Sequence, residues 1–453
     1  SAVKQVNLYL SSGIKIQVQI MHAPALRTLI GGRTLMTPRV LASLGQLGRL
    51  GSGVSTRSIH MSDNPHFDVV IVGAGAAGVA VASSMLNRKP NLQVCIIDPA
   101  TTHYYQPGWT MVGGGLFTPE STGHFIGKLL PQGVTWVNKA VKGFSPSDKM
   151  VHVENCKDVT YDKLVVCPGI KLDWDKVEGL PEALGKNGVT SNYRYDLAPY
   201  TWKLVQNMKS GKAIFTNPPM PIKCAGAPQK AMYLSADHWF KQDVLKNIDI
   251  QFNTALGVLF GVKDYVPALM EYVKKYDATL NFFHNLEKID GEKKVAYFRK
   301  GGENPSEELV PFEYDMIHVA PPQSAPDFIK ASPLADAAGW VDVDQSTLQH
   351  HKYEDIYALG DCISAPNAKT AAAARAQAPV VAYNVLADMG VKQERAVYSG
   401  YGSCPLTVER GKVVLAEFSY GGMLSPSLPK FLIDGTRPSR LGWLLKETIL
   451  PPF

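Results

Sequence analysis

The six cysteines of this 453-residue sequence never form a C-x-x-C pair. They are scattered along the chain, at Cys95, Cys156, Cys167, Cys224, Cys362 and Cys404. This scatter excludes the cysteine spacing of a structural zinc site, a small disulfide scaffold or a covalently attached haem. No metal site is predicted. A functional cysteine pair in a chain kept in a reducing compartment is therefore expected to be catalytic.

Acidic residues are absent from residues 1–62, which carry seven Lys and Arg residues. The seven positive charges of this segment account for the whole net charge of +6, so the rest of the chain is close to neutral. A near-neutral body gives no basis for nucleic-acid binding. From Met21 onward the segment is rich in Arg, Ser, Gly and Leu, which predicts a mitochondrial transit peptide; the alternative is a disordered basic tail.

The sequence also has no uninterrupted apolar run that predicts a transmembrane helix. The longest apolar stretch, residues 69–86, contains the pattern G-x-G-x-x-G at Gly73, Gly75 and Gly78, which explains it better than a membrane span. The stretch predicts a buried strand over residues 67–72, a glycine turn, and a helix from residue 79. In such a unit the glycines allow a tight turn and close approach of a pyrophosphate to the helix N-terminus.

A second predicted strand, residues 94–97, ends in Asp98, twenty residues after Gly78. A carboxylate at this distance accepts a hydrogen bond from a ribose hydroxyl. The two observations together predict an adenine dinucleotide, and they leave NAD and FAD both open.

A second glycine fingerprint is missing further along the chain. The predicted strand at residues 213–216 runs into residues 217–228, which contain four prolines and Cys224. Such a segment cannot hold a pyrophosphate as a glycine turn does, which argues for a reductant other than NAD(P)H. Lys223, Lys230 and a predicted helix start nearby favour a thiolate at Cys224. Cys404 is expected on a glycine-rich turn before a strand.

Three motifs occur in one order along the chain: the glycine turn at residues 73–78, a strand motif at residues 161–169, and Ala-Leu-Gly-Asp at residues 358–361. This order resembles the glutathione-reductase-like flavoproteins with two dinucleotide-binding domains. The resemblance implies an α/β fold with two Rossmann-like domains in tandem and a C-terminal membrane-associating region. The expected segments are 1–62 (transit peptide or disordered), 63–188 (FAD-binding domain), 189–335 (second Rossmann-like domain without an NAD fingerprint), 336–390 (return to the FAD domain) and 391–453 (quinone- or membrane-facing).

The segments Lys-Cys-Ala-Gly-Ala-Pro-Gln-Lys at residues 223–230 and Gly-Ser-Cys-Pro at residues 402–405 are similar to those of the mitochondrial-type sulfide:quinone oxidoreductases. Further matches are residues 103–107, 336–344, 360–362 and 369–373. By this resemblance Cys224 and Cys404 form the catalytic redox pair. The residues expected at FAD are Gly73, Gly75, Ala76, Ala77, Gly78, Asp98, Gln106, Val141, Asp361 and Lys369. For Lys369 the alternative is a solvated surface lysine.

The same resemblance implies a reaction, a set of partners and a location. Hydrogen sulfide would be oxidised to sulfane sulfur, passed to a small thiol such as glutathione or to sulfite, and FAD would reduce ubiquinone. The protein would lie peripherally or monotopically on the inner mitochondrial membrane. Its apolar tail and nearby cations suit an interfacial segment facing anionic lipid, the alternative being an ordinary docked helix: Trp443, Leu444, Leu445, Ile449, Leu450 and Phe453, with Lys430, Arg437, Arg440 and Lys446.

Three alternatives stay open at this point. A type-II NADH:quinone oxidoreductase has the same fold, but it needs the second glycine fingerprint. A sulfide dehydrogenase would pass its electrons to a cytochrome instead of a quinone. A flavin-bound redox sensor would oxidise its cysteine pair without turnover.

Overall fold

The computed structural model describes residues 4–9, 15–20, 64–366, 368–391 and 394–450. The chain forms two units, residues 1–59 and residues 60–453. In the first unit, β1 (Lys4–Tyr9) pairs with β2 (Lys15–Ile20) in antiparallel register. The rest of the predicted transit peptide lies outside the described residues. The functional argument concerns the second unit.

The second unit begins with the strand and glycine turn that the sequence predicts. A mixed sheet has the order β7-β4-β3-β10-β9-β8, and β21 pairs with β10 beyond this path. Its strands that run parallel to one another are β7 (Thr135–Val137), β4 (Val94–Ile97), β3 (His66–Val72), β10 (Val159–Val166) and β21 (Ile356–Ala358). The two antiparallel strands at one edge are β8 (Val141–Ser145) and β9 (Met150–Val153).

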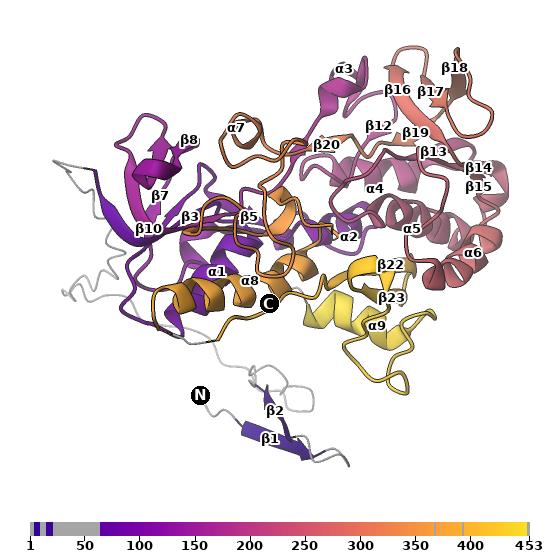
Figure 1. Cartoon of the computed structure of the whole chain (residues 1–453). Helices are drawn as coiled ribbons and strands as arrows, with labels where there is room; N and C mark the ends of the chain where they lie inside the picture. Colours follow the sequence, from indigo (N-terminus) through magenta and orange to yellow (C-terminus); the bar gives the residue numbers. More distant parts are fainter. Residues whose placement is uncertain (1–3, 10–14, 21–63, 367, 392–393, 451–453) are drawn as a thin grey trace, which may run out of the picture. The chain divides into compact units, whose positions relative to one another are not determined.

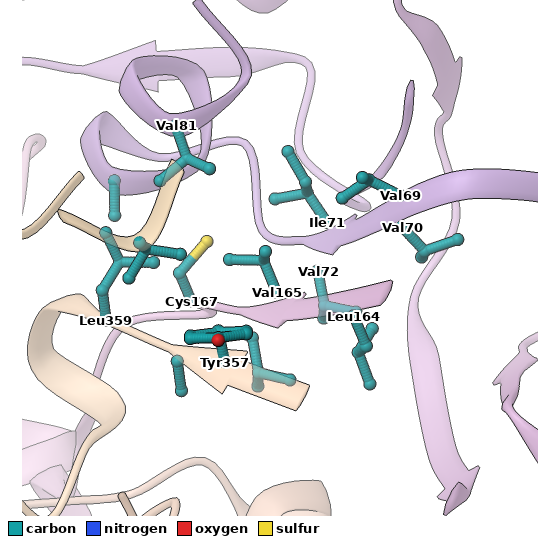
Figure 2. Close-up of a cluster of buried hydrophobic side chains, with 14 of the residues drawn as sticks. Val69, Val70, Ile71, Val72, Val81, Leu164, Val165, Cys167, Tyr357 and Leu359 are labelled. Carbon is teal, nitrogen blue, oxygen red and sulfur yellow. The ribbon is translucent and has the colours of Figure 1, made fainter. Parts of the chain in front are cut away.

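The core of this sheet explains why its strands are continuous apolar runs. Helix α1 (Ala76–Leu86) packs beside α8 (Ala371–Asp388), and both contribute to one buried cluster with the sheet. Figure 2 shows side chains of β3, β10 and β21 meeting in this cluster, including Ile71, Val165 and Tyr357. A strand covered on both faces has no polar face, so every position from Val69 to Val72 is buried.

A second sheet confirms the second α/β unit. Its five strands are all parallel, in the order β12 (Val189–Thr190), β19 (Met316–His318), β13 (Gly211–Asn217), β14 (Ile248–Thr254) and β15 (Thr279–Asn281). Helix α5 (Ala227–Lys241) contacts β13 and β14, and α6 (Val266–Lys275) shares their apolar cluster. This topology matches the Rossmann-like unit that the sequence predicts, although the turn after β13 contains no glycine fingerprint.

The C-terminal part of the chain adds a hairpin and a short helical segment. Strands β22 (Gly402–Glu409) and β23 (Lys412–Phe418) pair in antiparallel register, and α5 contacts β22. Helix α9 (Arg440–Leu444) packs on β23 and continues into a π-helical turn, Leu445–Ile449 (Figure 1). Within the part of the chain that the structure describes, no helix is long and apolar enough to cross a membrane.

Two local predictions are wrong, and one sheet was missed. The apolar pattern of residues 134–141 predicts one short strand, but they form parts of two strands, β7 and β8, because the chain leaves one edge of the sheet and re-enters at the other. The aromatic and glycine-rich composition of residues 102–115 predicts a loop, but this stretch contains β5 (Thr102–Tyr104) and α2 (Trp109–Gly113). A three-stranded antiparallel sheet was not predicted at all; it consists of β16 (His284–Asp290), β17 (Val295–Lys300) and β18 (Leu309–Glu313).

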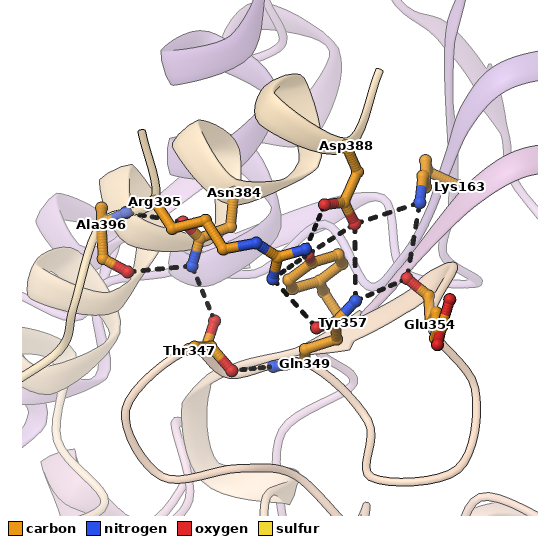
Figure 3. A network of polar contacts seen from close by, with 9 residues as sticks. All are labelled: Lys163, Thr347, Gln349, Glu354, Tyr357, Asn384, Asp388, Arg395 and Ala396. Atoms are coloured by element: carbon orange, nitrogen blue, oxygen red, sulfur yellow. Dashed lines mark hydrogen bonds and ion pairs between the residues drawn. The ribbon is translucent and has the colours of Figure 1, made fainter. Parts of the chain in front are cut away.

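A polar network fixes the far end of α8 (Figure 3). The carboxylate of Asp388 accepts hydrogen bonds from Lys163 Nζ at 3.1 Å and from the Tyr357 hydroxyl at 2.8 Å, and it pairs with Arg395. Lys163 belongs to β10 and Tyr357 to β21. The network therefore ties the last turn of α8 to the two strands of the first sheet that lead to the site.

Candidate active site

The glycine turn has the geometry that a dinucleotide phosphate requires. Gly73 has φ +109°, and a Cβ there would lie 2.5 Å from the Cys167 carbonyl oxygen. A Cβ on Gly78 would lie 1.9 Å from the Gly73 carbonyl oxygen, so α1 can approach β3 only without a side chain there. At Gly75, in contrast, a Cβ would meet nothing within 4 Å. The first and third glycines are thus needed for folding, while the second leaves space for a ligand.

Three further residues predicted to bind FAD, Ala76, Ala77 and Asp98, surround this turn. Ala76 is exposed at the first turn of α1, and Ala77 is buried against the sheet. Asp98 anchors the turn, because its carboxylate accepts from the Ala74 N–H at 2.6 Å and from the Ala100 N–H at 2.7 Å. A carboxylate oxygen can accept more than one hydrogen bond, so the predicted ribose contact is compatible with these bonds.

Asp361 and Lys369 lie close together at the start of α8. Burial raises the pKa of the Asp361 carboxyl, and the nearby amines of Lys369 and Lys223 oppose this shift. Lys369 is only 5% exposed, which excludes the alternative of a solvated surface lysine. Its Nζ donates to the Ile363 carbonyl oxygen at 3.0 Å and lies 4.1 Å from the Trp340 ring centroid. Thr370 caps α8, whose N-terminus carries positive partial charge.

Gln106 and Val141 occupy different surroundings. Gln106 lies at the start of a short turn and accepts a hydrogen bond from Lys223 Nζ at 2.7 Å. This bond joins the predicted FAD loop to the segment that carries Cys224. Val141 begins β8, at the antiparallel edge of the first sheet, and is buried there.

Together these residues fit an FAD molecule. The turn offers an open, side-chain-free approach at Gly75, the N-terminus of α1 has N–H groups suited to bind an anion, and the N-terminus of α8 with Lys369 supplies positive charge. The donor set suits a pyrophosphate and a ring that gains negative charge on reduction. The assignment of each residue to a particular FAD atom stays a prediction.

Cys224 and Cys404 are brought together although 180 residues separate them. Their Sγ atoms lie 3.4 Å apart. Cys224 follows β13, and Cys404 lies inside β22, so the prediction of a turn at Cys404 is wrong. The contact is possible because α5 packs on β22 and Gly226 leaves space there: a Cβ at Gly226 would lie 2.6 Å from Cys404 Sγ.

The loop that presents Cys224 is held by hydrogen bonds from three directions. Cys224 has φ +49°, a left-handed conformation that costs energy for a residue other than glycine. Its N–H donates to the Lys369 carbonyl oxygen at 2.7 Å. The Tyr193 hydroxyl donates to the Lys223 carbonyl oxygen, and the Lys223 N–H donates to Gln323 Oε1. Sequence patterns gave no signal for Tyr193 or Gln323, because only the folded chain brings them here.

The charges around the pair make the two sulfur atoms unequal. The hydrogen bond from the Cys404 thiol holds the pKa of Cys224 well below its usual range; burial opposes this, and the Lys230 ammonium supports it. Lys230 Nζ lies 3.1 Å from Cys224 Sγ. The same hydrogen bond and burial raise the pKa of Cys404. In the reduced pair Cys224 is therefore the thiolate and Cys404 the thiol.

Two lysine predictions need correction. Lys223 was expected to support the thiolate, but its amine turns to Gln106, and burial lowers its pKa to about 8. The cation in contact with the sulfur is Lys230. Lys446 was expected to face lipid, yet it is only 5% exposed and donates to the Pro405 carbonyl oxygen at 2.9 Å, next to Cys404.

The other cysteines are separate from this pair. Cys362 is buried, and its Sγ points to the Val166 and Leu359 carbonyl oxygens at 3.5 and 3.4 Å. Cys95 and Cys167 are buried in the core of the first sheet, and Cys156 is exposed. No group of three or more His, Cys, Asp or Glu residues in the described ranges could hold a metal ion.

The fold and the site define a two-domain flavin oxidoreductase with a cysteine pair in place of the second nucleotide turn. Residues 67–215 match the family model of the pyridine nucleotide-disulphide oxidoreductases. The chain is 39% identical over 386 residues to the mitochondrial sulfide:quinone oxidoreductase of Mus musculus, covering 85% of each chain. It is 39% identical over 435 residues to that of Dictyostelium discoideum, covering 95% of this chain and 93% of the relative. The chain belongs to the sulfide:quinone oxidoreductase family.

The fold is also that of a solved relative. The sulfide:quinone oxidoreductase structure from Aquifex aeolicus superimposes with a TM-score of 0.68 at 17% sequence identity, covering 84% of this chain and 89% of that chain. At this identity the likeness supports the fold alone. Members of the family are FAD-dependent, in agreement with the open glycine turn.

Proposed function

We propose that this protein is a mitochondrial enzyme that oxidises hydrogen sulfide and reduces ubiquinone, with Cys224 and Cys404 as its redox pair. The observation that carries the proposal is the 3.4 Å approach of the two sulfur atoms beside Lys230. This pair lies where a second dinucleotide turn would otherwise be expected. When bound, FAD supplies a two-electron acceptor that a quinone can reoxidise.

The unequal sulfur atoms define the direction of the first step. In the oxidised enzyme a sulfur–sulfur link joins Cys224 and Cys404. Hydrosulfide attacks Cys404 Sγ, a new bond forms to the incoming sulfur, and the link breaks with its electron pair on Cys224. A thiol of lower pKa leaves faster, so the low pKa of Cys224 makes it the leaving group. Cys404 then carries a persulfide.

The second step returns the pair to its oxidised form. A small thiol such as glutathione, or sulfite, takes the outer sulfur atom from Cys404. The link between Cys224 and Cys404 forms again when the pair gives up two electrons, for which bound FAD would be the acceptor. In total, hydrogen sulfide and a thiol RSH give the persulfide RSSH, and one quinone becomes a quinol, so that atoms and electrons balance.

The C-terminal segment suits the surface that a lipid-soluble quinone must reach. Its outer side exposes apolar side chains, at Phe431, Leu432, Leu441, Leu444 and Ile449. The side chains of Lys430 and Arg437 are 80% and 83% exposed. Apolar groups beside exposed cations favour binding to an anionic lipid surface, here that of the inner mitochondrial membrane. Trp443, expected on the same surface, is buried against β23 instead.

Single cysteine variants test the proposal. Cys224→Ser and Cys404→Ser should each keep the yellow FAD, because neither side chain supports the glycine turn. Both should lose bleaching of the flavin by sulfide under anaerobic conditions, measured by absorbance. Cys156→Ser, at an exposed cysteine far from the pair in sequence, is the matched control and should bleach normally. Sulfide-dependent quinone reduction at the normal rate by either active-site variant would disprove the scheme.

A further inference from the structure

Two buried lysines face the cysteine pair from opposite parts of the chain. Lys230, on α5, is 3% exposed, and Lys446, in the π-helical turn, is 5% exposed. Lys230 Nζ contacts Cys224 Sγ at 3.1 Å, and Lys446 Nζ donates to the carbonyl oxygen of the residue after Cys404. Among the described residues, no Asp or Glu oxygen lies within 4.0 Å of either amine. The sulfur atoms are therefore the counter-charges of both lysines.

The number of sulfur anions changes with the oxidation state of the pair. When Cys224 and Cys404 are linked, neither sulfur is charged, and two buried ammonium groups would lack a counter-charge. An unpaired buried charge is strongly unfavourable, so one amine must release its proton in this state. Burial lowers the pKa of Lys446 well below its usual value, and the charge of Lys230 lowers it further.

The positions of the two amines assign them different roles. Lys230 Nζ lies against Cys224, the sulfur that leaves as a thiolate, whereas Lys446 Nζ is bonded to the residue after Cys404, the sulfur that is attacked. In the reduced pair Cys224 and Cys404 raise the pKa of Lys230 above its usual value against the effect of burial, so Lys230 serves as the counter-charge of the leaving thiolate. Cys224 and Cys404 act on Lys446 in the same direction, without overcoming its burial. The groups facing Lys446 are thus Lys230 from α5, Cys224 from the loop after β13 and Cys404 from β22. Each new sulfur anion favours a proton on Lys446.

We propose that Lys446 is the base that accepts the proton of incoming hydrogen sulfide, a role that rests on the function proposed above. The sulfur atom of hydrogen sulfide bonds to Cys404 Sγ, and the link to Cys224 breaks with its electron pair on Cys224. One of the two protons of hydrogen sulfide passes to the neutral amine of Lys446, and the other stays on the new persulfide. The site gains one ammonium and one thiolate, so its total charge does not change.

The local fold is suited to hold this amine in place. Ser439 caps α9 through the Gly442 N–H, and Trp443 Nε1 donates to Glu447 at 2.6 Å. Trp443 also packs into an apolar cluster with Val413 and Leu415 of β23. A π-turn inserts an extra residue into a helix and is frequent at functional sites. Here the turn carries Lys446 inward from a segment whose neighbouring residues are partly exposed.

Two variants and one control test the role of Lys446. Lys446→Met removes the amine, and Lys446→Arg keeps a positive charge but cannot release a proton. Lys412→Met removes a partly exposed amine on the neighbouring β23, whose partner Glu409 keeps its bond to Lys275. The measurement is the rate of flavin bleaching by sulfide in the FAD-containing enzyme, by anaerobic stopped flow at different pH values.

At low pH, where dissolved sulfide is mainly the neutral, fully protonated form, both Lys446 variants should react about 100-fold more slowly than the wild type, because a positioned base contributes ~10²–10⁴. The gap should close as pH rises, since hydrosulfide needs no base. Lys412→Met should follow the wild type at every pH. If the gap is the same at every pH, Lys446 has only a structural role, and if there is no gap, it has none; either result overturns the proposal.

Folding and the underlying function are checked separately. Flavin content and Tm show whether each variant is folded, and the arginine variant decides the question where the methionine variant is unstable. A wild-type enzyme that sulfide does not bleach at any pH would contradict the proposed function itself. Normal bleaching of the wild type with unchanged pH profiles in the variants would contradict only the role of Lys446.

Discussion

At the scale of single residues, the three glycines of the first turn have different tasks. A Cβ at Gly78 would collide with the Gly73 carbonyl, whereas Gly75 has φ −72° and open space around it. Gly75→Ala should therefore fold with an unchanged Tm but bind FAD at least about tenfold more weakly, a loss of ~1.4 kcal/mol or more. Gly78→Ala should lose both stability and FAD. Thermal unfolding and flavin content of the purified variants measure the two effects.

The comparison within this pair of variants makes the prediction specific. If Gly75→Ala kept its full flavin content, the pyrophosphate would not approach this residue, and the site would need to be placed elsewhere. If Gly75→Ala unfolded as readily as Gly78→Ala, glycine at position 75 would be needed for folding of the turn, and its assigned role in ligand binding would be wrong.

Single residues also show where sequence reasoning reaches its limit. Both cysteines of the pair were predicted, because a resemblance to known motifs marks them. The environment of Lys446 could not be predicted, since its neighbours in sequence form an amphipathic, partly exposed segment. Its burial depends on the contact of α9 with β23, which no local pattern encodes. Lys223 and Lys230 were both expected to support the thiolate of Cys224, but the amine of Lys223 turns to Gln106, and only Lys230, on the first turn of α5, reaches the sulfur.

At the scale of secondary-structure elements, Asp388 holds one end of α8, while the other end begins beside Lys369 and Thr370, in the predicted flavin site. The carboxylate is 12% exposed, and Lys163, one of its partners, is 15% exposed. Asp388→Asn would leave Lys163 and Arg395 without their counter-charge. Breaking such a pair costs about 3–5 kcal/mol, and the partial exposure places the expected loss near the lower value. The Tm should fall by several degrees, measured with FAD bound.

A matched control separates this effect from the loss of any surface charge. Glu313→Gln removes the partner of Lys212 in an ion pair whose Glu313 side chain is 75% exposed. Such pairs contribute little, so the Tm should not change. Equal Tm values for Asp388→Asn and the wild type would show that the network does not stabilise α8.

The elements that sequence patterns predicted are those with the simplest burial. Strands β3, β4, β10 and β13 have parallel neighbours on both sides for most of their length, and they are visible as short apolar runs that end in glycine, proline or a polar loop. The antiparallel strands β16, β17 and β18 were missed, because they are half-buried and rich in charged residues. The start of β22 was taken as a turn since it contains Gly402 and Pro405, and only its pairing with β23 makes it a strand.

At the scale of the whole second unit, the site is assembled from three regions that are distant in sequence. The first sheet and α8 carry most of the residues predicted to bind FAD, the loop after β13 carries Cys224, and the C-terminal hairpin carries Cys404, with Lys446 bonded to the residue that follows it. Bonds between these regions, such as Lys223 to Gln106 and Cys224 to Lys369, connect the cysteine pair to the predicted flavin residues. Electron transfer from sulfide to flavin needs this arrangement. The segment boundaries proposed from the sequence stay predictions.

The most direct test of the central claim is an anaerobic absorbance titration of the intact, FAD-containing protein. Sulfide should bleach the flavin, a soluble ubiquinone analogue should then restore its colour, and NADH should have no effect because the second glycine turn is absent. A protein that NADH bleaches and sulfide does not would contradict the assignment of sulfide as the electron source.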